Sequence, residues 1–144
     1  MTSVIVTGGP GLRQEIEIRG KQMVVDEPPE VGGTDEGPTP YELLLSALGA
    51  CTSMTIAMYA RRKGWEVTGV RVELEHDRIH ARDCEECETE EGYLDRIRAR
   101  ISVDGPLHEE QRARLDEIAR RCPVYKTLTS RLRIEEELRL SAYM

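Results

Sequence analysis

The sequence predicts an α+β domain with mainly antiparallel strands, and two observations support this prediction. The first is a run without any charged residue, Leu43–Ala60, in a chain of which 33% of the residues are charged. The second is a set of short segments on both sides of this run, in which apolar residues recur at every second position, as in half-buried strands. Within 144 residues, these segments indicate a single domain, 1–144, with one long helix among antiparallel strands.

The N-terminal part of the chain predicts short strands followed by a loop. Residues Ser3–Thr7 alternate as a strand, and Gly8–Gly11 forms a turn. Residues 12–18 again place apolar side chains at even spacing, and Met23–Val25 predicts a third short strand. The segment Asp26–Pro40 contains four Pro and three Gly, which is typical of a loop and not of a helix.

The uncharged run predicts one long helix with recognisable ends. Thr39 is a good N-cap, Pro40 suits the first helical position, and Glu42 stands where a capping box needs a carboxylate. Gly64 follows three basic residues and predicts the C-terminal end. We expect this helix to be buried on all sides, with another helix packed at close range on its small residues. A domain of this size has few elements with which to cover such a helix, so we expect a homodimer in which two such helices bury each other.

The same run could also be a membrane span. Its 18 uncharged residues reach the lower edge of the required length, and Arg61, Arg62 and Lys63 would form a cytoplasmic flank. However, four of the 18 residues are Ser or Thr, and the segments on either side alternate like soluble strands. A core helix is therefore the preferred interpretation, and we expect no association with a membrane.

The second half of the chain predicts two strands, a helix and a last strand. Apolar residues alternate in 70–74 and again in 97–103, which predicts a pair of half-exposed strands. Residues 106–121 predict an amphipathic helix that the proline after Cys122 ends. A short turn at 125–130 should lead to a final strand over 132–140.

Composition excludes some classes of function. The formal net charge of −7 argues against non-specific nucleic-acid binding, which needs a basic surface. The first residues, MTSVIVTGG, lack a basic segment followed by an apolar run, so we expect no secretory signal and a cytoplasmic location. In such a chain, four cysteines favour catalytic or metal-binding roles over a structural disulfide framework.

Two of the cysteines stand far apart, in motifs of different character. Cys51 lies in the middle of the uncharged helix, where the helix dipole has no effect and burial should raise the pKa of the thiol. A reactive Cys51 would need a cation from another element, and otherwise it is a small core residue. Cys122 ends the amphipathic helix in the motif RCPVYKTL, at a chain reversal that suits a resolving cysteine.

A second group of residues could bind zinc. His76, His80, Cys84 and Cys87 form the pattern His-x3-His-x3-Cys-x2-Cys, which offers four ligands of the types that tetrahedral zinc prefers. The acidic residues around the CxxC should raise the pKa of its thiols, which weakens a redox interpretation. A zinc site, a redox disulfide and a solvated loop with two thiols all remain open.

Three stretches of the chain resemble the OsmC/Ohr family of thiol peroxidases. They are GGTDEGPTPYELLLSALGACTSMTIAMYA, GWEVTGVRVELEH and RCPVYKTL, and the resemblance runs from Val4 to about Leu140. The family's fold is an intertwined homodimer in which antiparallel sheets wrap around central helices. Its active sites lie at the interface between the subunits.

The resemblance implies a peroxidase that needs no cofactor. Cys51 would be the peroxidatic cysteine that attacks an organic hydroperoxide, and Cys122 the resolving cysteine that forms a disulfide for an external dithiol to reduce. In the family an Arg of the N-terminal hairpin holds the thiolate, and Arg13 is the nearest match, with Arg19 as the second choice.

One residue departs from the family pattern. The peroxidases have a catalytic Glu ten residues before the peroxidatic cysteine, and that position is Tyr41 here. Glu42 would point to the opposite face of the helix from Cys51, so we expect it to act as a capping residue. The alternative function is therefore a non-enzymatic dimer that binds an apolar small molecule, or zinc through the four residues above.

Overall fold

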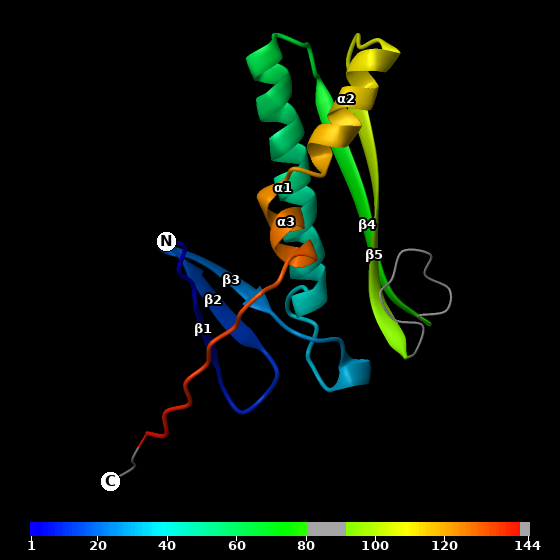
Figure 1. The fold of residues 1–144 in the computed structure, drawn as a ribbon. Helices are drawn as coiled ribbons and strands as arrows, with labels where there is room; N and C mark the ends of the chain where they lie inside the picture. Colours follow the sequence, from blue (N-terminus) through cyan, green and yellow to red (C-terminus); the bar gives the residue numbers. More distant parts are fainter. Residues whose placement is uncertain (81–91, 142–144) are drawn as a thin grey trace.

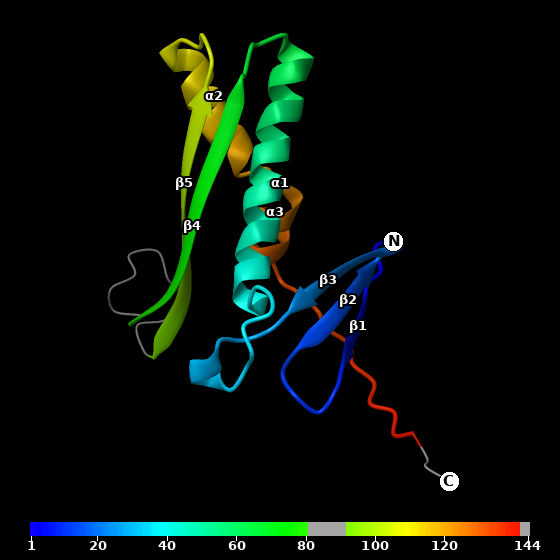
Figure 2. The same cartoon turned by 180° about the vertical axis from the view of Figure 1, so that it is seen from behind.

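The computed structural model describes residues 1–80 and 92–141 of the chain. In these residues two antiparallel sheets lie on opposite sides of the N-terminal end of a long helix, α1 (Figures 1 and 2). This arrangement confirms the predicted α+β class and the antiparallel pairing of the strands.

The first sheet consists of three N-terminal strands in the order β1–β2–β3. Their bounds are Ile5–Gly8 for β1, Gln14–Ile18 for β2 and Lys21–Val25 for β3. Arg19 and Gly20 form the two-residue turn between β2 and β3, and both have positive φ, 48° and 78°. Such a turn matches the twist of the two strands that it joins.

A loop with one short 3-10 helix, Pro29–Val31, connects this sheet to α1. Asp26 begins the loop and is only 1% exposed, because the loop folds back over its carboxylate. The carboxylate accepts hydrogen bonds from the Glu27 N–H at 2.8 Å, the Thr34 hydroxyl at 2.7 Å and the Glu36 N–H at 3.1 Å. These bonds hold the entrance to α1 in one conformation.

Helix α1 spans Pro40–Lys63 and begins and ends as the sequence predicts. Thr39 accepts the N–H of Glu42 at 3.2 Å, and the Glu42 carboxylate accepts the N–H of Thr39 at 2.8 Å, so the capping box is complete. Gly64 closes the C-terminal end with a φ of 73°.

The second sheet is a long hairpin of β4, Gly69–His80, and β5, Tyr93–Asp104. Its register runs from the pair Gly69 and Asp104 to the pair His80 and Tyr93, so both strands are longer than predicted. Strand β4 packs directly on α1. A Cβ atom on Gly49 would lie 2.6 Å from Cδ1 of Leu74.

That close contact corrects one expectation. The small residues of α1, Ser46, Gly49, Ala50 and Ser53, were expected to meet another helix, but within the described subunit they line a shallow groove against β4. A flat strand can approach a helix closely wherever the helix carries no large side chain, so small residues do not distinguish a helix from a strand as the neighbour.

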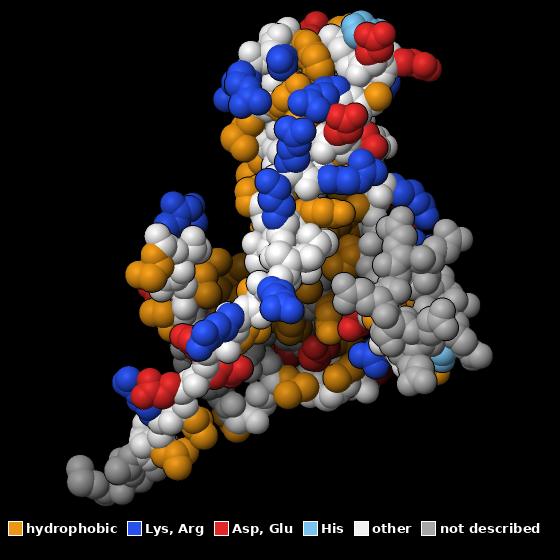
Figure 3. All heavy atoms as spheres, viewed as in Figure 1, with side chains coloured by type: hydrophobic (Ala, Val, Ile, Leu, Met, Phe, Trp, Pro, Cys, Tyr) orange, Lys and Arg blue, Asp and Glu red, His pale blue; other side chains and the backbone are white. Residues whose placement is uncertain are grey.

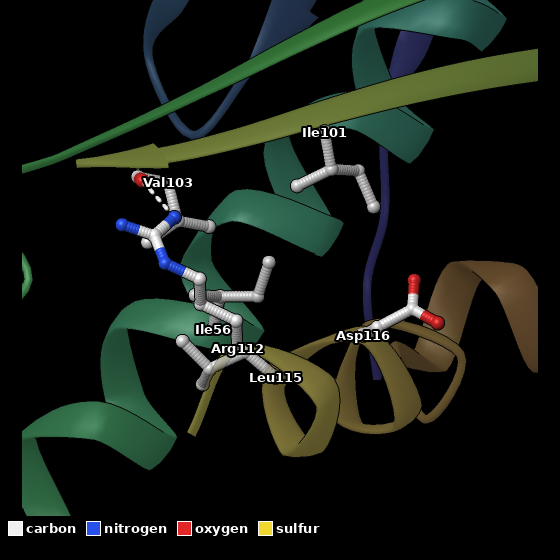
Figure 4. A pocket seen from close by; sticks show the side chains of 6 residues that line it. All are labelled: Ile56, Ile101, Val103, Arg112, Leu115 and Asp116. Carbon is white, nitrogen blue, oxygen red and sulfur yellow. Dashed lines mark hydrogen bonds between the residues drawn. The ribbon is translucent and has the colours of Figure 1, made fainter. Parts of the chain in front are cut away.

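Helix α2, Glu109–Ala119, packs across the C-terminal half of α1. Ile56 and Tyr59 of α1 form the core with Leu115, Ile118 and Ala119 of α2. A small cavity of about 120 Å³ remains between α1, α2 and β5 (Figure 4). Its polar wall includes Arg112, which donates to the carbonyl of Val103 at 3.3 Å.

The C-terminal part of the chain differs from the prediction in two ways. Residues expected to form a short turn belong to a helix, α3, Pro123–Thr129. Residues 130–141 form no strand, and the apolar side chains Leu132, Ile134, Leu138 and Leu140 are all exposed. Alternation alone cannot produce a strand, because a strand needs a partner to take up its backbone hydrogen bonds.

Within the described subunit, helix α1 is buried on one side only, and the expected burial on all sides, which involves a second subunit, stays a prediction. Met54 and Met58 are 63% and 62% exposed. Hydrophobic side chains gather at the surface along this edge of the molecule (Figure 3). Among the described residues α1 is the one helix with the length and hydropathy of a membrane span. Its contacts with β4, α2 and α3 are those of a core helix.

Candidate active site

The fold brings the two distant cysteines, Cys51 and Cys122, together. Cys51 lies in the middle of α1, and Cys122 is the N-cap residue of α3, which runs beside α1 (Figure 1). Both thiols are free, and they lie close enough for each to shift the pKa of the other. The pair therefore joins the centre of the long helix to the chain reversal that Pro123 imposes.

Cys122 is fully buried, at 0% exposure. Even so, the groups around its sulfur favour the thiolate form. Burial raises the pKa of its thiol, but hydrogen bonds from Cys51, the Tyr125 N–H, the Thr52 hydroxyl and the Val124 N–H outweigh that effect. The Tyr125 N–H lies 3.4 Å from Sγ. The pKa of Cys122 consequently lies below its ordinary value.

The half-buried Cys51 shows the opposite shift. Burial, followed by its interaction with Cys122, raises the pKa of the Cys51 thiol, and the Val124 N–H and Thr55 hydroxyl only partly compensate. None of these principal influences within the described subunit is a cation. Burial acts on Cys51 as the sequence predicts, and the helix does not activate the thiol.

A groove of about 550 Å³ lies near the cysteine pair, and neither Cys51 nor Cys122 is among the residues that line it. Its floor and walls are mostly apolar and include Leu48, Ile97 and Leu128. Thr52 and Tyr125 also line it, and both donate hydrogen bonds to Cys122. A small molecule with an apolar body could therefore lie in the groove against Thr52 and Tyr125, which neighbour Cys122.

Comparison with known proteins places the chain in a family. The family described as OsmC-like protein matches residues 33–137. The chain belongs to the OsmC-like family. Among curated proteins, none matches this OsmC-like chain.

Solved structures share the OsmC-like fold. An OsmC-like protein from Mycoplasma pneumoniae is 20% identical, with a TM-score of 0.71 over 89% of this chain and 86% of that one. An organic hydroperoxide resistance protein from Elizabethkingia anophelis is 16% identical, with a TM-score of 0.66 over 90% and 88% of the two chains. The organic hydroperoxide resistance protein OhrB of Bacillus subtilis is 18% identical, with a TM-score of 0.61 over 90% of each chain. At these identities the likeness shows the fold alone.

The candidate arginines of this OsmC-like protein lie in the N-terminal sheet. Arg13 precedes β2, and its guanidinium lies 3.1 Å from the carboxylate of Glu15 and 3.6 Å from that of Glu36. Arg19 occupies the turn between β2 and β3. The assignment of either residue to Cys51 stays a prediction.

The residue ten positions before Cys51, Tyr41, has its own partners in the OsmC-like chain. Tyr41 stacks on His76 with ring centroids 4.4 Å apart, and His76 Nε2 lies 2.9 Å from Oδ1 of Asp95. Glu42 is engaged in the capping box, as expected from its position. The start of α1 is thus tied to β4 by an aromatic contact.

The predicted zinc ligands are only partly described. His76 bonds Asp95, and His80 packs edge-on against Tyr93 with centroids 5.3 Å apart. Cys84 and Cys87 lie outside the described residues. Within residues 1–80 and 92–141 no three potential ligand side chains gather as a metal site, so the zinc prediction stays untested.

Sequence reasoning missed the residues that surround the sulfurs. Thr52 and Thr55 read as ordinary polar residues of a helix, although a hydroxyl beside a buried cysteine is a usable signal. The N–H groups of Val124 and Tyr125 belong to the backbone, so the identity of these residues does not predict their role. Only Pro123, which suits the first position of a helix, suggests that free N–H groups follow Cys122.

Proposed function

We propose that this OsmC-like protein is a cysteine-based peroxidase that reduces organic hydroperoxides. The observation that carries the proposal is the proximity of the free thiols of Cys51 and Cys122, each of which shifts the pKa of the other. Such a pair can be oxidised to a disulfide, because the two side chains come from separate elements, α1 and the start of α3, and lie near each other.

The proposed reaction follows from thiol chemistry. Sγ of Cys51 attacks one peroxide oxygen, the O–O bond breaks, and the alcohol leaves while Cys51 becomes a sulfenic acid. Cys122 then attacks the sulfur of that sulfenic acid, and a disulfide forms with loss of water. An external dithiol restores both thiols. No step requires a cofactor.

The apolar groove supports an organic peroxide as the substrate. A hydrocarbon body gains free energy when it leaves water for a groove lined by Leu, Ile and Ala side chains. Similar folds belong to proteins named organic hydroperoxide resistance proteins. Because Cys51 has no cation among its principal influences, the proposed enzyme also needs a guanidinium, and Arg13 is our candidate.

We further propose a cytoplasmic homodimer without nucleic-acid or membrane partners. The exposed apolar face of α1 and the exposed apolar side chains of 130–141 support a second copy as the missing cover. In a dimer, Arg13 could approach Cys51 from its own subunit or from the other one.

The test is peroxide consumption with a dithiol reductant, measured on several alkyl hydroperoxides. All proteins would carry Cys84→Ser and Cys87→Ser, so that only Cys51 and Cys122 can react. We expect turnover in this background and loss of at least a hundredfold in kcat/KM with Cys51→Ser, because serine is a far poorer nucleophile. Absence of turnover on every peroxide tried would refute the proposal.

A second candidate is a non-enzymatic dimer that binds an apolar small molecule, and the groove beside Thr52 favours it. A fluorescent fatty-acid analogue would then bind equally well to the wild type and to Cys51→Ser, while neither consumes peroxide. The zinc variant of this candidate predicts one zinc per chain by elemental analysis, lost with Cys84→Ser.

A further inference from the structure

The groove near the cysteine pair contains a straight apolar strip with a charged residue at its start. Strand β5 contributes Ile97, Ala99 and Ile101 to the lining, and Asp95 lies two residues before them. Because alternate residues of a strand face the same side, these four side chains form one line of about 20 Å along the groove. Such a line suits the hydrocarbon chain of a lipid.

A carboxylate lies at each end of this line. Asp95 occupies one end. Asp116 of α2 also lines the groove, and together with Ile101 it lines the small cavity beside it, which places Asp116 near the other end (Figure 4). Both carboxylates contact solvent, with 56% and 62% of their side chains exposed. A ligand with a terminal carboxylate would therefore meet a like charge whichever way it lay.

The cations at the two ends are already paired. Among the described residues that line the groove, Arg120 is the one cation, and its Nη1 lies 3.1 Å from Oδ2 of Asp116. At the opposite end, His76 Nε2 lies 2.9 Å and Arg78 Nε 3.8 Å from Oδ1 of Asp95. An anionic ligand would have to compete with these carboxylates for a cation, whereas an uncharged ligand leaves the pairs intact.

We propose that the groove selects uncharged long-chain hydroperoxides over those that carry a carboxylate, and that Asp95 and Asp116 determine this specificity. Esterified lipids belong to the favoured class, and free fatty acids to the disfavoured one. This inference rests on the proposed function and names the class of its substrate.

The experiment compares two substrates that differ only at one end, the hydroperoxide of linoleic acid and that of its methyl ester. Their kcat/KM values are measured at pH 8 with a dithiol reductant, below the critical micelle concentrations, in the Cys84→Ser, Cys87→Ser background. We expect the ester to be preferred at least about fivefold, the size of one like-charge contact in a site open to water.

Asp116→Asn tests the origin of this preference, because it removes one carboxylate and frees Arg120 to pair with the ligand. We expect the preference for the ester to fall below about twofold, as for an exposed ion pair replacing a repulsion. Asp95→Asn is the second variant and should also lower the preference. Glu117→Gln is the matched control: it makes the same charge change one residue away, but Glu117 pairs with Arg114 at 2.8 Å and does not line the groove. Its preference should equal that of the parent.

A binding measurement separates this inference from the proposed function. cis-Parinaric acid and its methyl ester are fluorescent and carry no peroxide, so their affinities for the same proteins do not depend on turnover. Tighter binding of the ester by a protein that consumes no peroxide would refute the proposed function and leave this inference standing. Turnover with equal kcat/KM for acid and ester would overturn the inference alone. A preference that neither Asp116→Asn nor Asp95→Asn changes would overturn it as well.

Discussion

Asp26 shows how a single buried carboxylate can organise the loop in front of the functional helix. The Thr34 hydroxyl, followed by N–H groups of Glu27, Glu36 and Thr34, holds the pKa of this carboxyl below its ordinary value of 3.8, against the effect of burial. The sequence indicated only a loop here. Nothing in a Pro- and Gly-rich stretch reveals which carboxylate the loop will enclose.

The lowered pKa of Asp26 predicts a pH dependence of stability. A carboxyl with a depressed pKa in the folded state contributes its full stabilisation above the ordinary pKa, and this contribution is lost as the pH falls through the folded value. We expect Asp26→Asn to be less stable than the wild type at pH 7, with the difference shrinking below about pH 4. Urea unfolding from pH 3 to 7 measures it. A difference that stays constant with pH would contradict the prediction.

Helix α1 illustrates which properties of an element are local. Its N-cap, capping box and glycine C-cap were predicted at the observed residues, because each depends on neighbours within four positions. The side of α1 that packs on β4 was not predicted, because it depends on the contact between Gly49 and Leu74, which lies 25 positions later. The same limit explains α3, where Pro123 was read as a stop and in fact begins a new helix.

The capping box predicts a measurable contribution to stability. Thr39→Ala removes the acceptor of the Glu42 N–H, and we expect it to lower the free energy of unfolding by about 1 kcal/mol. Thr39→Ser is the matched control, because it keeps the hydroxyl, and it should stay close to the wild type. Chemical denaturation of the three proteins provides the measurement, and equal stabilities would show that the cap contributes nothing.

The whole molecule presents more apolar surface than an isolated subunit should. One face of α1 is open, the two sheets do not meet, and residues 130–141 expose four large apolar side chains (Figures 1 and 3). These features indicate an interaction surface, because soluble proteins rarely leave apolar surface of this extent exposed to water. A second copy of the chain would cover it.

Self-association is therefore the prediction at this scale. We expect the wild type to sediment as a dimer at micromolar concentration, and Met54→Glu to dissociate it, because a charge would be buried in the interface. Met54→Leu conserves the apolar volume and should remain a dimer. Analytical ultracentrifugation distinguishes the three proteins, and a wild type that sediments as a monomer would contradict the prediction.

The sequence by itself determined the α+β class, the ends of α1, the antiparallel pairing and the two cysteines worth considering. All of these follow from spacing, from capping residues and from a resemblance carried by contiguous motifs. The tertiary structure alone decided that Cys51 and Cys122 interact, that Thr52 and two N–H groups surround Cys122, and that residues 132–140 form no strand within the subunit. The physical reason is that a pKa or a strand depends on groups brought close in space, and 71 positions of sequence separate the two sulfurs that the fold joins.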